Sequence, residues 1–190
     1  MNIPNRLTTL RLIITVIQVV LYCVFKDTTW IMFVVAGLFI IGSLTDFLDG
    51  KIARKYHLVT GFGKLMDPIA DKLLVISCIM ILVDNKTIPY WWIALIVVAR
   101  ELFVSGIRLA AIEGDGNVIA ADRFGKLKTL TQMTSLSVLL VLAGLKSFIV
   151  SQWIDYLILA FLILFYISVV LCVASGISYF IKNRHYFKMK

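Results

Sequence analysis

Long apolar runs alternate with short polar segments along this 190-residue chain. Six runs are long enough to cross the hydrocarbon core of a bilayer as helices, and the sixth is expected to be uniformly apolar. The expected spans are residues 7–25, 30–49, 66–84, 90–110, 128–146 and 153–181. Trp30 and the Tyr90-Trp91-Trp92 run stand where two spans begin, as aromatic residues do at membrane interfaces. The pattern predicts an all-α polytopic membrane protein with six transmembrane helices in a single domain, residues 1–190.

The basic residues lie mostly on one side of the predicted membrane. The net charge is +8, a value that could also suggest nucleic-acid binding. Only Lys26, Lys86 and Lys146 fall in the connections on one side. The basic residues at or beyond the span ends on the other side are Arg6, Arg11, Lys51, Arg54, Lys55, Lys64, Arg108, Arg123, Lys126, Lys182, Arg184, Lys188 and Lys190. By the positive-inside rule that second side is cytoplasmic. Topology thus explains the charge without nucleic acid, and predicts a multi-pass protein of the cell (inner) membrane with both termini cytoplasmic.

The remaining composition adds little chemistry. The first apolar run is not followed by a small-residue cleavage site, so we expect it to stay rather than to be removed as a signal peptide. The cysteines fall within expected spans and lack the spacing of metal ligands. We therefore expect Cys23, Cys78 and Cys172 to be small buried apolar residues.

Acidic residues are concentrated in one stretch at the cytoplasmic boundary. It reads Asp46-x-x-Asp49-Gly50-x-x-Ala53-Arg54, then eight residues, then Gly63-x-x-x-Asp67-x-x-x-Asp71. On a helix, the first half places two carboxylates and two small residues on one face, and the second half makes a similar stripe. Helical rise counted from the outer ends of the two spans puts both aspartate pairs at a similar depth. If the chain turns back between them, four carboxylates surround one small volume.

Four carboxylates that close repel one another unless cations lie among them. Oxygen ligands favour Mg²⁺ or Mn²⁺ over Zn²⁺, and two divalent cations suit phosphoryl chemistry. Gly50 and Ala53 leave space for a ligand near the helix backbone, and Arg54 can bind a phosphate oxygen. The stretch therefore predicts a polar, metal-binding cavity, open to the cytoplasmic face, for a phosphorylated nucleotide or lipid.

Two plainer interpretations remain open for these acids. The aspartates could form salt bridges with basic neighbours on the same segments, namely Lys51, Arg54, Lys64 and Lys72. Asp67 alone could be a helix N-cap, because Pro68 is a residue type common at the first helical position. The N-cap interpretation leaves the other three aspartates unexplained.

Further charged residues fall inside the expected spans. Arg11 could extend to the lipid headgroups or point inward at an anion. Arg100 and Glu101 lie near mid-membrane and should have partners, either as a structural ion pair or as the lining of an anionic pocket. The residues of two inward polar stripes are Glu101, Ser105 and Arg108 in the fourth span, and Lys128, Thr131, Gln132 and Ser135 in the fifth.

The acidic stretch resembles the complete signature of the CDP-alcohol phosphatidyltransferases. Its eight fixed positions would match by chance in roughly one of 10⁹–10¹⁰ starting positions at average residue usage. The resemblance implies six transmembrane helices, a CDP-linked lipid bound through its pyrophosphate, and CMP as the leaving group. It implies that Asp46, Asp49 and Asp67 are metal ligands. Asp71 would both reach the metals and act as the base that deprotonates the acceptor hydroxyl. Gly50, Ala53, Arg54 and Gly63 are the expected residues of the CDP-lipid site.

Softer matches point to the branch of that family that makes phosphatidylglycerophosphate. They are Asn2-Ile3-Pro4-Asn5-x-Leu7-Thr8, Ala99-Arg100-Glu101-x-x-Val104-Ser105-x-x-Arg108 and Gly125-Lys126-x-Lys128-Thr129-x-x-Gln132. This resemblance implies CDP-diacylglycerol and sn-glycerol 3-phosphate as substrates and a homodimer in the lipid bilayer. A small dianion needs several cations around it, and the candidates for its phosphate are Arg11, Arg100, Arg108, Lys126 and Lys128.

Other assignments can be distinguished from this one. Family relatives use serine, inositol, inositol phosphate or phosphatidylglycerol as the acceptor, and the main signature is common to them all. A divalent-cation or proton-coupled transporter would also carry intramembrane acids, but near the midplane between repeated halves. Here the acids are predicted near one face, and the sequence shows no repeat.

Overall fold

The computed structural model describes residues 3–56, 61–115 and 123–182. Side chains are described in these ranges except at positions 3–7, 46–56, 61–65, 67, 68, 107–115, 123, 124, 126 and 182. The chain is helical, as expected. The helices are α1 (Ile3–Phe25), α2 (Ile31–Tyr56), α3 (Gly61–Asp84), α4 (Trp91–Asp115), α5 (Arg123–Lys146) and α6 (Gln152–Lys182).

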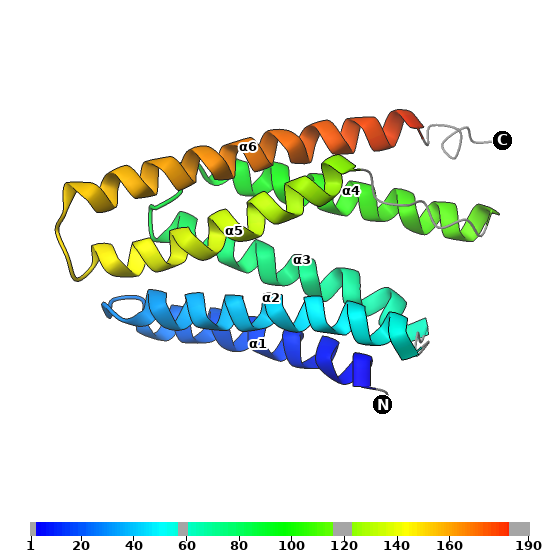
Figure 1. Ribbon diagram of the computed structural model, residues 1–190, viewed down its shortest axis with the longest axis horizontal. Helices are drawn as coiled ribbons and strands as arrows, with labels where there is room; N and C mark the ends of the chain where they lie inside the picture. The colour runs from blue at the N-terminus through cyan, green and yellow to red at the C-terminus, as the bar shows by residue number, and fades with distance from the viewer. Residues whose placement is uncertain (1–2, 57–60, 116–122, 183–190) are drawn as a thin grey trace.

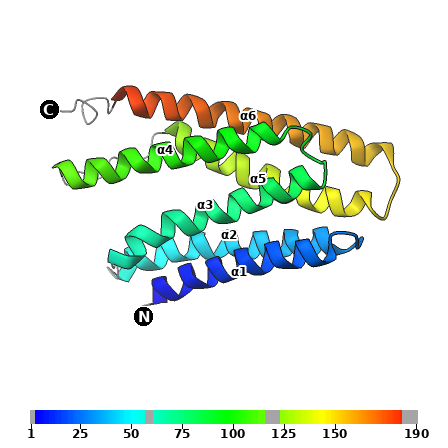
Figure 2. The ribbon, with the colours of Figure 1, turned by 180° about the vertical axis from the view of Figure 1, so that it is seen from behind.

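These helices form a bundle in which neighbours in space are not always neighbours in sequence (Figure 1). α1 packs on α2 and α3, α2 packs on α5, α5 on α6, α6 on α4, and α4 on α3, which closes a ring. α3 also contacts α2 and α5. The view from behind shows α4 crossing in front of α5 (Figure 2).

The helices run alternately up and down, so their connections fall at two ends. The segments between α1 and α2, α3 and α4, and α5 and α6 lie at one end, which we call the turn end (Figure 1). α1 begins and α6 ends at the opposite end, where α2 also ends and α3 begins. We call this the site end. The predicted alternation of the connections is therefore confirmed.

The interior differs between the two ends. The apolar core collects towards the turn end, from residues such as Val35, Phe39, Leu82, Val97 and Leu139. From mid-depth to the site end the buried set becomes polar, and it contains Thr8, Arg11, Thr15, Gln18, Lys128, Gln132, Ser135, Ser168 and Ser175. Buried polar groups are costly without partners or ligands. The fold thus packs apolar side chains towards one end and buries more polar side chains towards the other.

Three helical stretches among the described residues are long and apolar enough to cross a membrane. They are Thr8–Phe25, Leu127–Lys146 and Gln152–Ile181. The described apolar part of α2, Ile31–Thr45, is shorter. Large apolar side chains also cover the outward faces of α1 and α6, for example Val20 and Val170, which suits contact with lipid rather than water. These are features of a membrane protein, and crossing by all six helices stays a prediction.

Three details of the sequence interpretation are wrong. Cys23 is exposed, whereas Cys78 and Cys172 are buried as expected; α1 packs on α2 and α3, and Cys23 lies on its outward face. α6 is not uniformly apolar, because the buried Ser168 and Ser175 face the bundle, and hydropathy averaged over their apolar neighbours hides them.

The interpretation of Asp67 as a helix N-cap is also wrong. α3 begins at Gly61, well before Asp67 and Pro68, so neither residue stands at a helix start. A proline inside a helix removes one backbone hydrogen bond. The helix continues through it to Asp84.

Candidate functional site

The acidic motif lies on two neighbouring helices, which meet at Gly42 of α2 and Leu74 of α3. A Cβ atom placed on Gly42 of α2 would lie 2.8 Å from the Cδ2 atom of Leu74 of α3, so glycine is what permits the approach. The two helices run in opposite directions and are joined at the site end (Figure 1). This contact therefore gives a common reference point from which the heights of the two halves of the motif along the bundle can be counted.

The register brings the aspartates to matching heights. At a rise of 1.5 Å per residue, Asp46 lies about 6 Å beyond Gly42 towards the site end, and Asp71 lies about 4.5 Å beyond Leu74. By the same count, Asp49 and Asp67 each lie about 10.5 Å beyond that contact. Asp46 is thus level with Asp71, and Asp49 is level with Asp67.

Only part of the predicted metal site can be followed to its side chains. Asp71 is described and is half-buried. The side chains of the other predicted residues lie outside the described set, and they are Asp46, Asp49, Gly50, Ala53, Arg54, Gly63 and Asp67. Among the described residues no group of three or more His, Cys, Asp or Glu side chains is placed to hold a metal ion. The metal ligands therefore stay a prediction that the backbone register supports.

A cluster of charged side chains lies between α4, α5 and α6. The Oε1 atom of Glu101 accepts a hydrogen bond from the Nη1 of Arg100 at 2.9 Å and another from the Nζ of Lys128. The three side chains are only 9–15% exposed. The expectation that Arg100 and Glu101 have partners is confirmed. The inward direction of the fifth-span stripe is also confirmed, since Lys128, Gln132 and Ser135 are buried and Thr131 is half-buried.

This cluster is linked to the helix that carries Asp71. The next residue, Lys72, donates from its ammonium group to the Oγ of Ser105 on α4. The Ser105 hydroxyl in turn donates to the backbone carbonyl of Glu101 at 2.7 Å. Polar contacts thus extend from the neighbour of Asp71 across α4 to the charged cluster.

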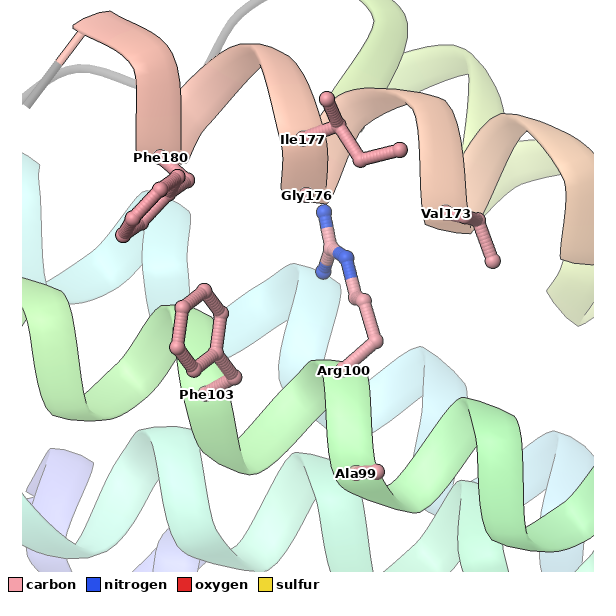
Figure 3. Close-up of a pocket in the computed structure, with 7 residues that line it drawn as sticks. All are labelled: Ala99, Arg100, Phe103, Val173, Gly176, Ile177 and Phe180. Atoms are coloured by element: carbon pink, nitrogen blue, oxygen red, sulfur yellow. The ribbon is translucent and has the colours of Figure 1, made fainter.

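Arg100 is held mainly by α6. Its Nε donates to the carbonyl oxygen of Cys172 at 2.8 Å and its Nη2 donates to the Oγ of Ser175. A Cβ atom on Gly176 would lie 3.1 Å from the Cγ of Arg100, so this glycine leaves room for the arginine against the helix. Figure 3 shows the guanidinium reaching from α4 to α6 at Gly176.

A pocket of about 410 Å³ lies beside Arg100 between α4 and α6 (Figure 3). Apart from Arg100 its lining is apolar, and it consists of Ala99, Phe103, Val173, Gly176, Ile177 and Phe180. The rings of Phe103 and Phe180 contact each other at a tilt of 43°, with centroids 5.7 Å apart, and both are exposed on the outside of the bundle. Such a lining suits hydrocarbon rather than a phosphate, so the acceptor site predicted from sequence is not this pocket.

The structure describes the side chains of three of the five predicted acceptor-binding residues. Arg11 is 1% exposed, so it points into the bundle rather than towards the headgroups. Arg100 and Lys128 are part of the Glu101 cluster. The side chains of Arg108 and Lys126 lie outside the described residues. Their common role as ligands of a phosphate stays a prediction.

Sequence reasoning missed what α6 contributes. Cys172 and Ser175 bind Arg100, and Gly176 makes space for it. Together with Ser168, these residues recur at helical spacing on one face, which is the signal that could have identified them. The sequence predicts Lys72 only as a possible salt-bridge partner of the aspartates. Because a lysine inside an apolar span needs a polar partner within the bundle, a contact such as the one with Ser105 was also to be expected.

Comparison with known proteins decides the family. The family model "CDP-alcohol phosphatidyltransferase" matches residues 1–178. This chain belongs to the CDP-alcohol phosphatidyltransferase family. The match covers all of the acidic motif and both polar stripes, so the resemblance inferred from the motif is confirmed.

Individual members of the family align over nearly the whole chain. A protein of Bacillus subtilis (strain 168) is 38% identical over 192 residues, with 96% of this chain and 95% of the relative covered. One of Rickettsia typhi is 40% identical, with 98% and 99% covered, and one of Escherichia coli (strain K12) is 32% identical, with 94% and 92% covered. All three are named CDP-diacylglycerol–glycerol-3-phosphate 3-phosphatidyltransferase.

Proposed function

We propose that this chain transfers the phosphatidyl group from CDP-diacylglycerol to sn-glycerol 3-phosphate, giving phosphatidylglycerophosphate and CMP in phospholipid synthesis. The observation that carries the proposal is the alignment, over more than nine-tenths of both chains, with family members that bear the name of this reaction. The buried basic side chains at the site end support this proposal, because an acceptor that carries a phosphate needs an anion site in addition to the one that binds the pyrophosphate.

The donor set fits two divalent cations. The register of α2 and α3 brings four carboxylate-bearing positions to two matching heights, and carboxylate oxygens suit Mg²⁺ or Mn²⁺. The residues that would hold the cations are Asp46, Asp49, Asp67 and Asp71. When bound, such cations neutralise the pyrophosphate of the CDP-lipid and polarise its phosphorus.

The protein's own residues bind the substrates and move the proton. Arg54 would bind a phosphate oxygen of the CDP-lipid, while Gly50, Ala53 and Gly63 leave space for it near the helix backbones. The acceptor hydroxyl oxygen forms a bond to the phosphorus of the phosphatidyl group as the bond from that phosphorus to CMP breaks. Half-buried Asp71 takes the hydroxyl proton as general base.

The acceptor phosphate would be bound by cations from several helices. Arg11 and Lys128 are buried on α1 and α5, and Arg100 is largely buried on α4. Arg108 and Lys126 complete the proposed set. Because the basic residues gather towards the site end, this end faces the cytoplasm in the proposed topology. The family resemblance adds a homodimer.

A divalent-cation transporter is the rival from another class. Its acids should lie near the midplane, whereas the register here puts them beyond the Gly42–Leu74 contact towards one end. The discriminating experiment uses the purified protein in two assays. We expect CMP release from CDP-diacylglycerol that requires glycerol 3-phosphate and Mg²⁺ or Mn²⁺, and no metal flux into liposomes. Metal flux without CMP release would contradict the proposed enzyme activity and favour the assignment as a transporter.

A further inference from the structure

We propose that Gln132 is an acceptor-binding residue whose side-chain amide donates to the phosphate of the acceptor, beside Lys128. This inference rests on the proposed function and deepens it. Gln132 is 2% exposed, and its Nε2 has no hydrogen-bond partner among the residues that the structure describes. A buried hydrogen-bond donor without a partner lowers stability. The burial of the Gln132 amide therefore needs a reason other than the stability of the fold, such as the binding of a ligand.

The position of Gln132 explains which ligand it would bind. It lies four residues after Lys128 on α5, so the two side chains leave the same face of the helix about 5–6 Å apart at their Cβ atoms. An ammonium group and an amide at that spacing can donate to different oxygens of one phosphate. Both residues are buried on the polar, site-end side of the apolar core.

Glu101 keeps Lys128 in place for this task. Lysine has a flexible stem with considerable rotamer entropy, and the ammonium group of Lys128 donates to the carboxylate of Glu101. Arg100, by contrast, is also fixed by the Cys172 carbonyl and the Ser175 hydroxyl. Arg100 is thus held in its place by α6, whereas Lys128 and Gln132 form a pair on one face of α5 that can bind the acceptor phosphate together.

A second buried glutamine provides a matched control. Gln18 on α1 is fully buried, and its amide nitrogen donates to the Sγ of Cys78 at 3.0 Å and to the Oγ of Ser77 at 3.5 Å. Its amide thus joins α1 to α3. Replacing Gln18 removes hydrogen bonds between α1 and α3, although its Oε1 has no partner among the described residues. Replacing Gln132 removes an amide donor that has no partner in the described part of the chain.

The experiment compares Gln132→Leu with Gln18→Leu in detergent. For Gln132→Leu we expect an unchanged or higher Tm, a KM for glycerol 3-phosphate raised about 10- to 100-fold, as for a hydrogen bond to a charged group, and an unchanged KM for CDP-diacylglycerol. For Gln18→Leu we expect a lower Tm and an unchanged KM for glycerol 3-phosphate. A purely structural Gln132 would instead lower the Tm and leave the KM unchanged.

The possible failures can be told apart. If wild type releases CMP with glycerol 3-phosphate but Gln132→Leu keeps the wild-type KM for it, this inference is overturned and the proposed function stands. If wild type does not use glycerol 3-phosphate at all, the proposed function itself fails. Gln132→Met, which keeps the unbranched shape of the side chain, provides the same test if the leucine variant does not fold.

Discussion

Gly42 of α2 lies against Leu74 of α3 at a point where no side chain larger than hydrogen fits without movement, since an added Cβ would be 2.8 Å from the Cδ2 of Leu74. Leu74 is fully buried, so it has little room to yield. Counted along each helix from this contact, the two pairs of aspartates lie at matching heights. The proposed catalytic geometry therefore depends in part on a contact outside the acidic motif.

Substitution at this contact should disturb both stability and activity. We expect Gly42→Ala to lower the free energy of unfolding by about 1–3 kcal/mol, as overpacking does, and to lower kcat because the aspartate-bearing ends of α2 and α3 shift. Gly37→Ala on the same helix is the control, because nothing lies within 4 Å of the added Cβ. Thermal unfolding and CMP release measure both effects. Equal behaviour of the two variants would contradict the proposed register.

The acidic motif can be tested one residue at a time. Asp46→Asn, Asp49→Asn and Asp67→Asn should each lose most activity while the protein still purifies folded, because an amide is a poorer ligand for a hard cation than a carboxylate. Asp155→Asn is the control, since Asp155 forms an exposed ion pair with Lys146 at 2.7 Å at the turn end. Wild-type turnover in all three motif variants would rule out the proposed metal site.

Asp71 is expected to differ from the other three in its response to metal. A general base lowers the barrier to proton transfer, whereas a residue that is only a ligand mainly holds the cation. Asp71→Asn should therefore stay inactive at saturating Mg²⁺ or Mn²⁺ and still bind CDP-diacylglycerol. Turnover against metal concentration is the measurement, and recovery of activity by metal alone would show that Asp71 is a metal ligand only and not the base.

Replacing the basic residues proposed to bind the acceptor should change the KM of one substrate more than that of the other. Arg108→Ala or Lys126→Ala should raise the KM for glycerol 3-phosphate far more than the KM for CDP-diacylglycerol, because only the acceptor loses a charge partner. Lys26→Ala, at the exposed turn end, should change neither constant. Equal rises in both KM values would instead indicate general damage to the site.

The sequence predicts the helices well at one end and less well at the other. At the turn end, helix-breaking segments such as residues 85–89 end the apolar run and the helix at the same place. The observed and expected bounds therefore differ there by at most one residue. At the site end the helices continue past the apolar spans, α2 to Tyr56 rather than 49 and α4 to Asp115 rather than 110. Hydropathy marks where a helix meets lipid, and charged residues such as Lys and Arg extend a helix without interrupting it.

The sequence predicts those parts of the candidate site that depend on the spacing of charged residues along the chain. The motif of four aspartates identified the family, and the partners of Arg100 and Glu101 were expected from the cost of burying charge. Spacing could not reveal the Gly42–Leu74 contact. It also could not reveal that, among the described residues, the Nε2 of Gln132 has no hydrogen-bond partner while the Nε2 of Gln18 has two. Those facts depend on which helices pack together, and the ring order of the bundle is not encoded in any one segment.

The identity of the acceptor is the most direct test of the proposed function. Purified wild type would be given CDP-diacylglycerol with Mg²⁺ or Mn²⁺ and, side by side, glycerol 3-phosphate, serine or inositol, and the lipid products would be identified. We expect phosphatidylglycerophosphate and equimolar CMP from glycerol 3-phosphate. We expect no lipid product from serine or inositol, because they have no phosphate to bind to the buried basic side chains. A product from serine or inositol, and none from glycerol 3-phosphate, would contradict the proposed reaction while leaving the family intact.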